Sequence, residues 1–80
     1  MPKSIFSTEQ IALQNLLRKV RSEAGLTQAA LAKKLNRPQS FVSKYEIGER
    51  RLDLVELRQV CAALNVSLTR FVKRFENIEP

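Results

Sequence analysis

Signals that start and stop helices recur at short spacings along this chain, and they constrain the fold more than any other feature. Hydroxyl and carboxylate side chains that can cap a helix alternate with residues that tolerate a left-handed backbone or break a helix. The starts lie at Ser7, Thr27, Asp53 and Ser67, and the stops at Gly25, at Asn36 to Pro38 and at Gly48. Ser7 with Gln10 and Asp53 with Glu56 have capping-box spacing. The predicted helices are about 8–24, 28–35, 39–47, 54–64 and 68–75.

Apolar residues recur every three or four positions in these segments, as on the buried face of a helix. The fourth stripe consists of Leu54, Leu57, Cys61 and Leu64, and the last segment carries Leu68, Phe71, Val72 and Phe75. No stretch alternates apolar and polar residues for long enough to predict a strand. We therefore expect an all-α fold of five short helices, in one domain spanning residues 1–80 with its core over about 8–76.

The composition argues against metal and catalytic chemistry. The chain has 80 residues, no His and one Cys, which leaves no zinc cluster and no internal disulfide. Cys61 is the one candidate nucleophile, and without a His to activate it we expect a core thiol in a protein that is not an enzyme and has no cofactor. No segment approaches the roughly 18 apolar residues of a membrane span, so we expect a cytoplasmic protein.

Positive charge is concentrated around the second and third predicted helices. The net charge is +6, and residues 33–51, with six basic and two acidic side chains, carry +4 of it. An excess of this kind suits an anionic partner, either nucleic acid or an acidic membrane surface. A solvated charged face is the alternative, and charge alone does not decide between them.

The predicted helix 39–47 has two unlike faces. At about 100° per residue, one side holds Phe41, Val42, Tyr45 and Glu46, and the other holds Gln39, Ser40, Ser43 and Lys44. The second side carries no acid that would repel phosphate, whereas an ordinary solvent face mixes Glu with Lys. Gln can form two hydrogen bonds with adenine, Ser can donate or accept, and Lys suits guanine or phosphate. This face is a candidate for contact with DNA bases.

Two segments carry a family resemblance. Residues 25–32 are GLTQAALA and residues 39–50 are QSFVSKYEIGER. The series Gly-Leu-Thr-Gln, Leu-Ala, Val-Ser and Glu-x-Gly-x-Arg at these spacings closely resembles the Cro/C1-type (XRE-like) helix-turn-helix family. The resemblance covers about residues 11–75 and places the helix-turn-helix unit at about 27–48. It implies a compact, lambda-repressor-like DNA-binding domain and a sequence-specific regulator of transcription, expected to be a repressor in a bacterial or phage nucleoid.

The resemblance also implies the residues that contact double-stranded DNA. Base edges in the major groove would be contacted by Gln39, Ser40, Ser43 and Lys44, and phosphates by Thr27, Gln28, Arg37, Lys44, Arg50 and Arg51. Gln28 suits a phosphate because it opens a helix whose first amides are free. The alternative for Gln28 is a solvent-exposed residue without a ligand, and two of the four basic residues named here are expected to be solvated charges.

Further residues are implied to have structural roles. Ala32 lies where the two helices of the unit cross, Asn36 holds a turn position that the family usually fills with Gly, and Val42 seats the third helix on the second. Arg21 and Glu46 are expected to form a partly buried salt bridge, with two unrelated surface charges as the alternative.

Two positions depart from the family pattern. Pro38 stands where a Ser or Thr commonly caps the third helix, which leaves the first residue of that helix open by one or two places. Ile47 replaces a residue that is usually polar. Packing on the fourth helix and contact with the DNA backbone are the two alternatives for it.

One such domain contacts few bases, so a homodimer on a roughly palindromic site is expected. The interface between the two copies would include Phe71, Phe75 and Ile78. The alternatives for these three residues are packing in the core or a frayed C-terminal tail, and both fit the sequence equally well. No small-molecule ligand is evident. The alternative function is that of an antitoxin, or another small protein-interaction module, that also binds DNA.

Overall fold

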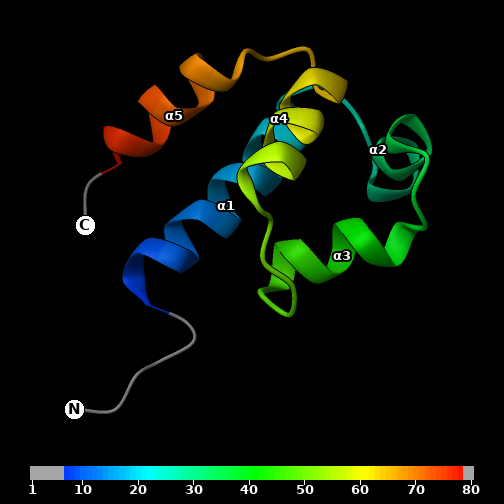
Figure 1. The fold of residues 1–80 in the computed structure, drawn as a ribbon, viewed down its shortest axis with the longest axis horizontal. Helices are drawn as coiled ribbons and strands as arrows, with labels where there is room; N and C mark the ends of the chain where they lie inside the picture. Colours follow the sequence, from blue (N-terminus) through cyan, green and yellow to red (C-terminus); the bar gives the residue numbers. More distant parts are fainter. Residues whose placement is uncertain (1–6, 79–80) are drawn as a thin grey trace.

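The computed structural model describes residues 7–78 and contains five α-helices, α1 (Thr8–Glu23), α2 (Gln28–Leu35), α3 (Gln39–Ile47), α4 (Leu54–Ala63) and α5 (Leu68–Glu76) (Figure 1). There is no strand in this range, which confirms the all-α prediction, and the helix boundaries fall within one residue of those expected. No helix of the described range is both long enough and apolar enough to cross a membrane. The ends of the predicted domain, residues 1–6 and 79–80, lie outside the described residues.

Side-chain caps define four of the five helix starts. The side-chain oxygens of Ser7, Thr27, Asp53 and Ser67 each accept a hydrogen bond, at 2.7–3.0 Å, from the backbone amide three residues later. At the start of α4 the motif is reciprocal, because the Glu56 carboxylate also accepts from the Asp53 amide at 3.0 Å. Pro38 precedes α3 and forms no side-chain cap, and Gln39 is the first residue of that helix.

Left-handed asparagines end two of the helices. Asn36, after α2, has φ 58° and ψ 43°, the conformation that short polar side chains tolerate best after glycine. Its amide donates to the Lys33 carbonyl at 3.1 Å, and Pro38 prevents α2 from continuing. Asn65 has φ 63° just after α4, a stop that the sequence analysis did not include.

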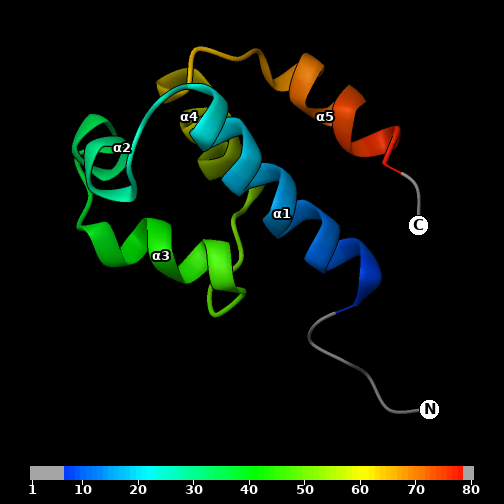
Figure 2. The ribbon, with the colours of Figure 1, turned by 180° about the vertical axis from the view of Figure 1, so that it is seen from behind.

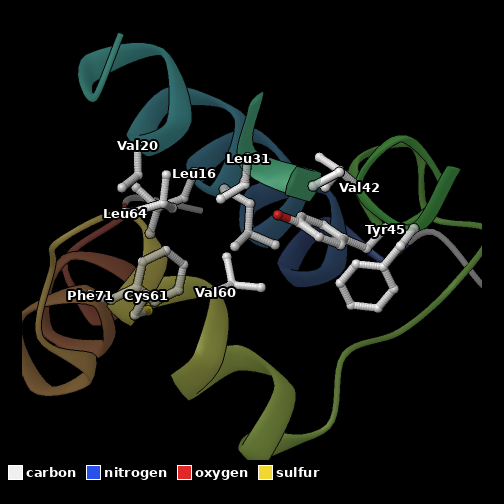
Figure 3. Packing of buried hydrophobic residues seen from close by; sticks show 12 residues of the cluster. Leu16, Val20, Leu31, Val42, Tyr45, Val60, Cys61, Leu64 and Phe71 are labelled. Carbon is white, nitrogen blue, oxygen red and sulfur yellow. The ribbon is translucent and has the colours of Figure 1, made fainter. Parts of the chain in front are cut away.

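Every helix contributes to one core. The helices contact one another in a ring, in the order α1, α3, α2, α4 and α5 and back to α1, and Figures 1 and 2 show α3 along one edge of the molecule with α5 on the opposite side. Figure 3 shows the side chains that fill the centre, among them Leu16, Val20, Leu31, Val42, Tyr45, Val60, Cys61, Leu64 and Phe71. Ala32 is buried with them. The ring thus holds α3 in a fixed place with one side free.

The first turn of α4 does not join the core, so the prediction for Leu54 is wrong. Its side chain is 68% exposed, and Val55 beside it is also exposed. The buried stripe begins one turn later, with Leu57 packed against the core and Val60 and Cys61 inside it. Periodicity alone does not show which turn of a helix its neighbours cover.

Phe71 cannot belong to a dimer surface, which corrects the expectation for that residue. It is 1% exposed and packs in the core. Phe75 is half-buried against the same core, whereas Val72 and Ile78 are exposed. The side of α5 that carries Phe71 therefore attaches this helix to its own chain.

Leu31→Ala is expected to lower the free energy of unfolding by about 2–5 kcal/mol, because it empties a fully buried site in α2. Leu54→Ala removes the same atoms from an exposed site and should change that free energy by no more than about 0.5 kcal/mol. Urea unfolding followed by circular dichroism measures both variants. Equal losses would contradict the exposure of the first turn of α4.

Candidate nucleic-acid interface

Helix α3 separates its two faces as the sequence predicts. Phe41, Val42, Tyr45 and Glu46 are buried, whereas Gln39, Ser40 and Lys44 are exposed and Ser43 is half-exposed. On the outer side, the Ser43 hydroxyl donates a long hydrogen bond (3.4 Å) to the Ser40 carbonyl. Because α3 runs along an edge of the molecule (Figure 1), this row of polar side chains can reach a partner without any rearrangement of the core.

Ile47 belongs to the outer side as well. At about 100° per residue it falls between Ser43 and Lys44 around the helix, and it is 51% exposed. Contact with a DNA backbone, one of the two alternatives for this residue, is therefore sterically open to it. The outer face of α3 ends in an exposed apolar group at its last turn.

The buried acid of α3 fixes the orientation of the helix. Glu46 is 1% exposed, and its carboxylate accepts hydrogen bonds from Arg21 Nε at 2.7 Å, Arg21 Nη2 at 3.0 Å and Gln28 Nε2 at 2.9 Å. The Arg21 side chain is largely buried too. Its hydrogen bond with the Glu46 carboxylate raises the pKa of Arg21 above the usual value for arginine. Three helices thus meet at one carboxylate, with Arg21 from α1 and Gln28 from α2.

The backbone of the same residue is also bound. Arg18 Nη2 donates to the Glu46 carbonyl at 2.8 Å, and Arg21 Nη1 donates to the Leu26 carbonyl at 2.9 Å, in the connection between α1 and α2. Gln14 is buried beside them, and in the amide orientation that satisfies both of its ends it accepts from the Gly48 amide at 3.2 Å. The C-terminal end of α3 is therefore bound by three side chains of α1.

The two residues predicted to bind phosphate at the start of α2 have other partners in the structure. Gln28 donates one of its two side-chain N–H groups to Glu46. Thr27 uses its side-chain oxygen to cap α2, accepting from the Ala30 amide. These two bonds do not use the second side-chain N–H of Gln28 or the hydroxyl hydrogen of Thr27, so each residue keeps one donor. Sequence reasoning missed the link from Gln28 to Glu46, since no local pattern joins positions 18 residues apart.

A second cluster joins the ends of α3 to α4; we call its four members, Arg37, Phe41, Arg50 and Glu56, the Glu56 cluster. Arg50 donates from Nη1 and Nη2 to the two carboxylate oxygens of Glu56, at 2.9 and 2.6 Å, and Arg37 Nη2 lies 3.6 Å from the same carboxylate. Both guanidinium carbons lie over the Phe41 ring, at 4.3 Å for Arg37 and 4.7 Å for Arg50.

Glu56 is a site residue that the sequence analysis identified only as a helix cap. The Arg50 guanidinium, helped by the Asp53 amide, lowers the pKa of its carboxyl to about 2. The positions of Arg37, Arg50 and Glu56 in the chain follow no helical period. The path of residues 48–53 brings them together, and no signal in the sequence specified that path.

Two of the acids around α3 are paired with arginines, whereas several cations there form no salt bridge within residues 7–78. Glu46 and Glu56 are bound by arginines, whereas Lys33, Lys34, Lys44 and Arg51 are exposed and form no salt bridge within residues 7–78. Glu49, in the connection that follows α3, is exposed. No group of three His, Cys, Asp or Glu side chains within the described range could hold a metal ion. The surface around α3 is accordingly basic and suited to a polyanion.

Comparisons with known proteins agree with this geometry. The family model described as helix-turn-helix matches residues 17–71. Among solved structures, an XRE-family-like protein from Pseudomonas syringae pv. tomato is 43% identical, with a TM-score of 0.82 over 90% of this chain and 88% of that one. The wild-type restriction–modification controller protein C.Esp1396I is 28% identical, with a TM-score of 0.79 over 88% of this chain and 91% of that one.

The clp gene regulator ClgR from Corynebacterium glutamicum is similar as well. It is 26% identical, with a TM-score of 0.77 over 88% of this chain and 90% of that one. C.Esp1396I has also been solved as a tetramer in complex with its natural 35-base-pair operator. A search of curated proteins found no match.

Arg21→Met is expected to lower the free energy of unfolding by about 3–5 kcal/mol, because it leaves the Glu46 charge buried without its main partner. Arg74→Met is the matched control, since it removes a cation from the exposed pair between Arg74 and Glu23, and exposed pairs contribute little. Thermal melting measures both. A melting temperature of Arg21→Met within a degree or two of wild type would overturn the role given to Glu46.

Glu56 should make part of the stability sensitive to acid. Its pKa is about 2 in the folded protein against 4.5 for an ordinary glutamate, so its contribution is complete above about pH 4.5 and is lost as the pH falls towards 2. The difference in Tm between wild type and Glu56→Gln is expected to be constant near neutral pH and to shrink over that acid range. A difference that persists unchanged down to pH 2 would contradict the assignment.

Proposed function

Because the chain belongs to the Cro/C1-type (XRE) helix-turn-helix family, we propose that α3 enters the major groove of double-stranded DNA while α2 lies across the phosphates. The chain is a DNA-binding regulator of transcription. One observation carries the proposed orientation: the outer face of α3 is exposed and free of acids, while its inner face is held by Glu46. Repression is the simplest outcome, since occupation of an operator needs no surface beyond the DNA interface.

Base contacts are assigned to the outer face of α3. Gln39 is placed in the first turn of α3, the part of a recognition helix that comes nearest the base edges, and its amide suits adenine. Lys44 suits guanine or a phosphate, and Ser40 and Ser43 can donate or accept. Ile47, exposed at the last turn, is assigned to the sugar-phosphate backbone.

Phosphate contacts surround this face. The first amides of α2 and the donors left over on Thr27 and Gln28 suit one strand. Arg51 and Lys44 are exposed, and Arg37 and Arg50 lie beside the first turn of α3, over Phe41. Contacts of this kind fix the orientation on the duplex without selecting a sequence.

Two copies of the chain are expected on each site. One recognition helix of nine residues contacts only a few base pairs, and a two-fold dimer doubles that number with half-sites about 10 bp apart. The similar controller protein C.Esp1396I forms a tetramer on its operator. With Phe71 in the core, Phe75 and Ile78 are the residues of the predicted dimer surface that remain available.

Selection of bound sites from a random pool of duplexes tests the proposal. The selected sites are expected to contain two inverted half-sites about 10 bp apart. Gln39→Ala should change the preferred bases at one position in each half-site, whereas Arg51→Ala should weaken binding to all sequences alike and make the dependence on salt less steep. If both variants weaken all sequences equally, α3 is not the element that selects the sequence.

A further inference from the structure

The Glu56 cluster has more structure than two phosphate-binding arginines require. Arg50 is held at three points, by both oxygens of Glu56 and by the carbonyl of Arg51 at 3.0 Å, and it lies over the Phe41 ring. Arg37 shares both the ring and the carboxylate. A surface cation does not ordinarily have so many fixed partners, because an exposed long side chain is free to move.

We propose that Glu56 is a positioning residue for DNA binding: it sets Arg37 and Arg50 beside the first turn of α3 in the orientation in which they bind phosphates. The inference rests on the proposed function and adds to it an acidic residue that does not itself touch DNA.

The geometry of the Arg50 guanidinium supports this role. Nη1 and Nη2 face the carboxylate, and the other N–H of Nη1 donates to the Arg51 carbonyl. The Nε–H and the second N–H of Nη2, which lie on the adjoining edge of the group, have no hydrogen-bond partner within residues 7–78. Such an edge matches two oxygens of a phosphate. The edge toward Glu56 is anchored, and the adjoining edge keeps the two donors that we assign to a DNA phosphate.

The exposed fractions of the three charged side chains agree with this arrangement. The carboxylate side chain is 14% exposed, whereas the arginine side chains are 39% (Arg37) and 35% (Arg50) exposed. Glu56 therefore lies deeper than the cations it holds, and they stand closer to solvent than the acid does. With two arginines on one carboxylate, the cluster keeps a net positive charge.

The position of Phe41 connects the cluster to the groove. Phe41 is the third residue of α3, and the N-terminal part of a recognition helix lies closest to the bases. Two guanidinium groups within 5 Å of its ring centroid, at 4.3 and 4.7 Å, therefore stand beside the end of α3 that enters DNA. An arginine that is already ordered there loses less conformational freedom when a phosphate arrives.

The test is Glu56→Gln, measured by fluorescence anisotropy on the selected duplex over a series of salt concentrations. Removal of an acid would by itself strengthen DNA binding. If Glu56 positions the arginines, affinity should instead fall, by roughly three- to tenfold. The slope of log K against log salt should also become less steep, by about the amount that one phosphate contact contributes. Gln keeps a side-chain oxygen for the Asp53 amide, so the helix cap can be retained.

Glu49→Gln is the matched control, since it removes the same charge from an exposed acid in the connection between α3 and α4, one that forms no salt bridge within the described residues. It should leave affinity unchanged or raise it. In a background that already carries Arg37→Ala and Arg50→Ala, Glu56→Gln should have no further effect on binding. Should Glu56→Gln unfold at the assay temperature, Glu56→Asp, which keeps the charge and withdraws it from both arginines, is expected to lower affinity in the same way.

Two outcomes would overturn the proposal. Tighter binding by Glu56→Gln, with a steeper salt dependence, would mean that Glu56 only competes with phosphates for the arginines. A loss of affinity that persists in the background without the arginines would mean that Glu56 acts through the fold. If wild type itself shows no salt-dependent binding to the selected duplex, the proposed function fails, and that result is distinct from either of these.

Discussion

The rest of the structure depends on the burial of one carboxylate. Glu46 lies on the inner side of α3, where an unpaired charge would be strongly unfavourable, and it is satisfied only when Arg21 and Gln28 are both in place. Those partners come from α1 and α2, so the requirement fixes three helices at once. The apolar core stabilises many arrangements of similar helices, whereas this polar contact is satisfied in one orientation of α3.

The acids and cations of the basic region are arranged in depth as well as along the chain. Glu46 and Glu56 lie beneath the surface with arginines over them, and Lys44 and Arg51 stand outside. A count of charges along the sequence treats these groups alike. In three dimensions the acids hold the cations in place and contribute less to the potential that a polyanion meets.

Local signals were enough to predict where the helices lie. Each cap joins residues three apart, and Asn36 needs only its own backbone preference to end α2, so the boundaries could be predicted without tertiary information. The division of α3 into two faces followed from helix geometry in the same way. The pairing of Arg21 with Glu46 came from the family resemblance, since no local pattern relates α1 to α3.

What could not be predicted depends on contacts between distant residues. Leu54 fits the period of α4, yet nothing in that period shows that the Leu54 side chain is exposed. Phe71 could face either the core or a partner until the position of α5 was known. The bond between Gln28 and Glu46, and the convergence of Arg37 and Arg50 on Glu56, depend on how the connections bring separate helices together.

The packing of Cys61 has a chemical consequence for a protein with a single thiol. The side chain is enclosed in the core and burial raises its pKa, so the reactive thiolate is scarce and oxidants have little access to the sulfur. Two copies of the chain paired on DNA, as proposed above, would therefore have no accessible thiols with which to cross-link. The protein is accordingly expected to work equally well under reducing and oxidising conditions.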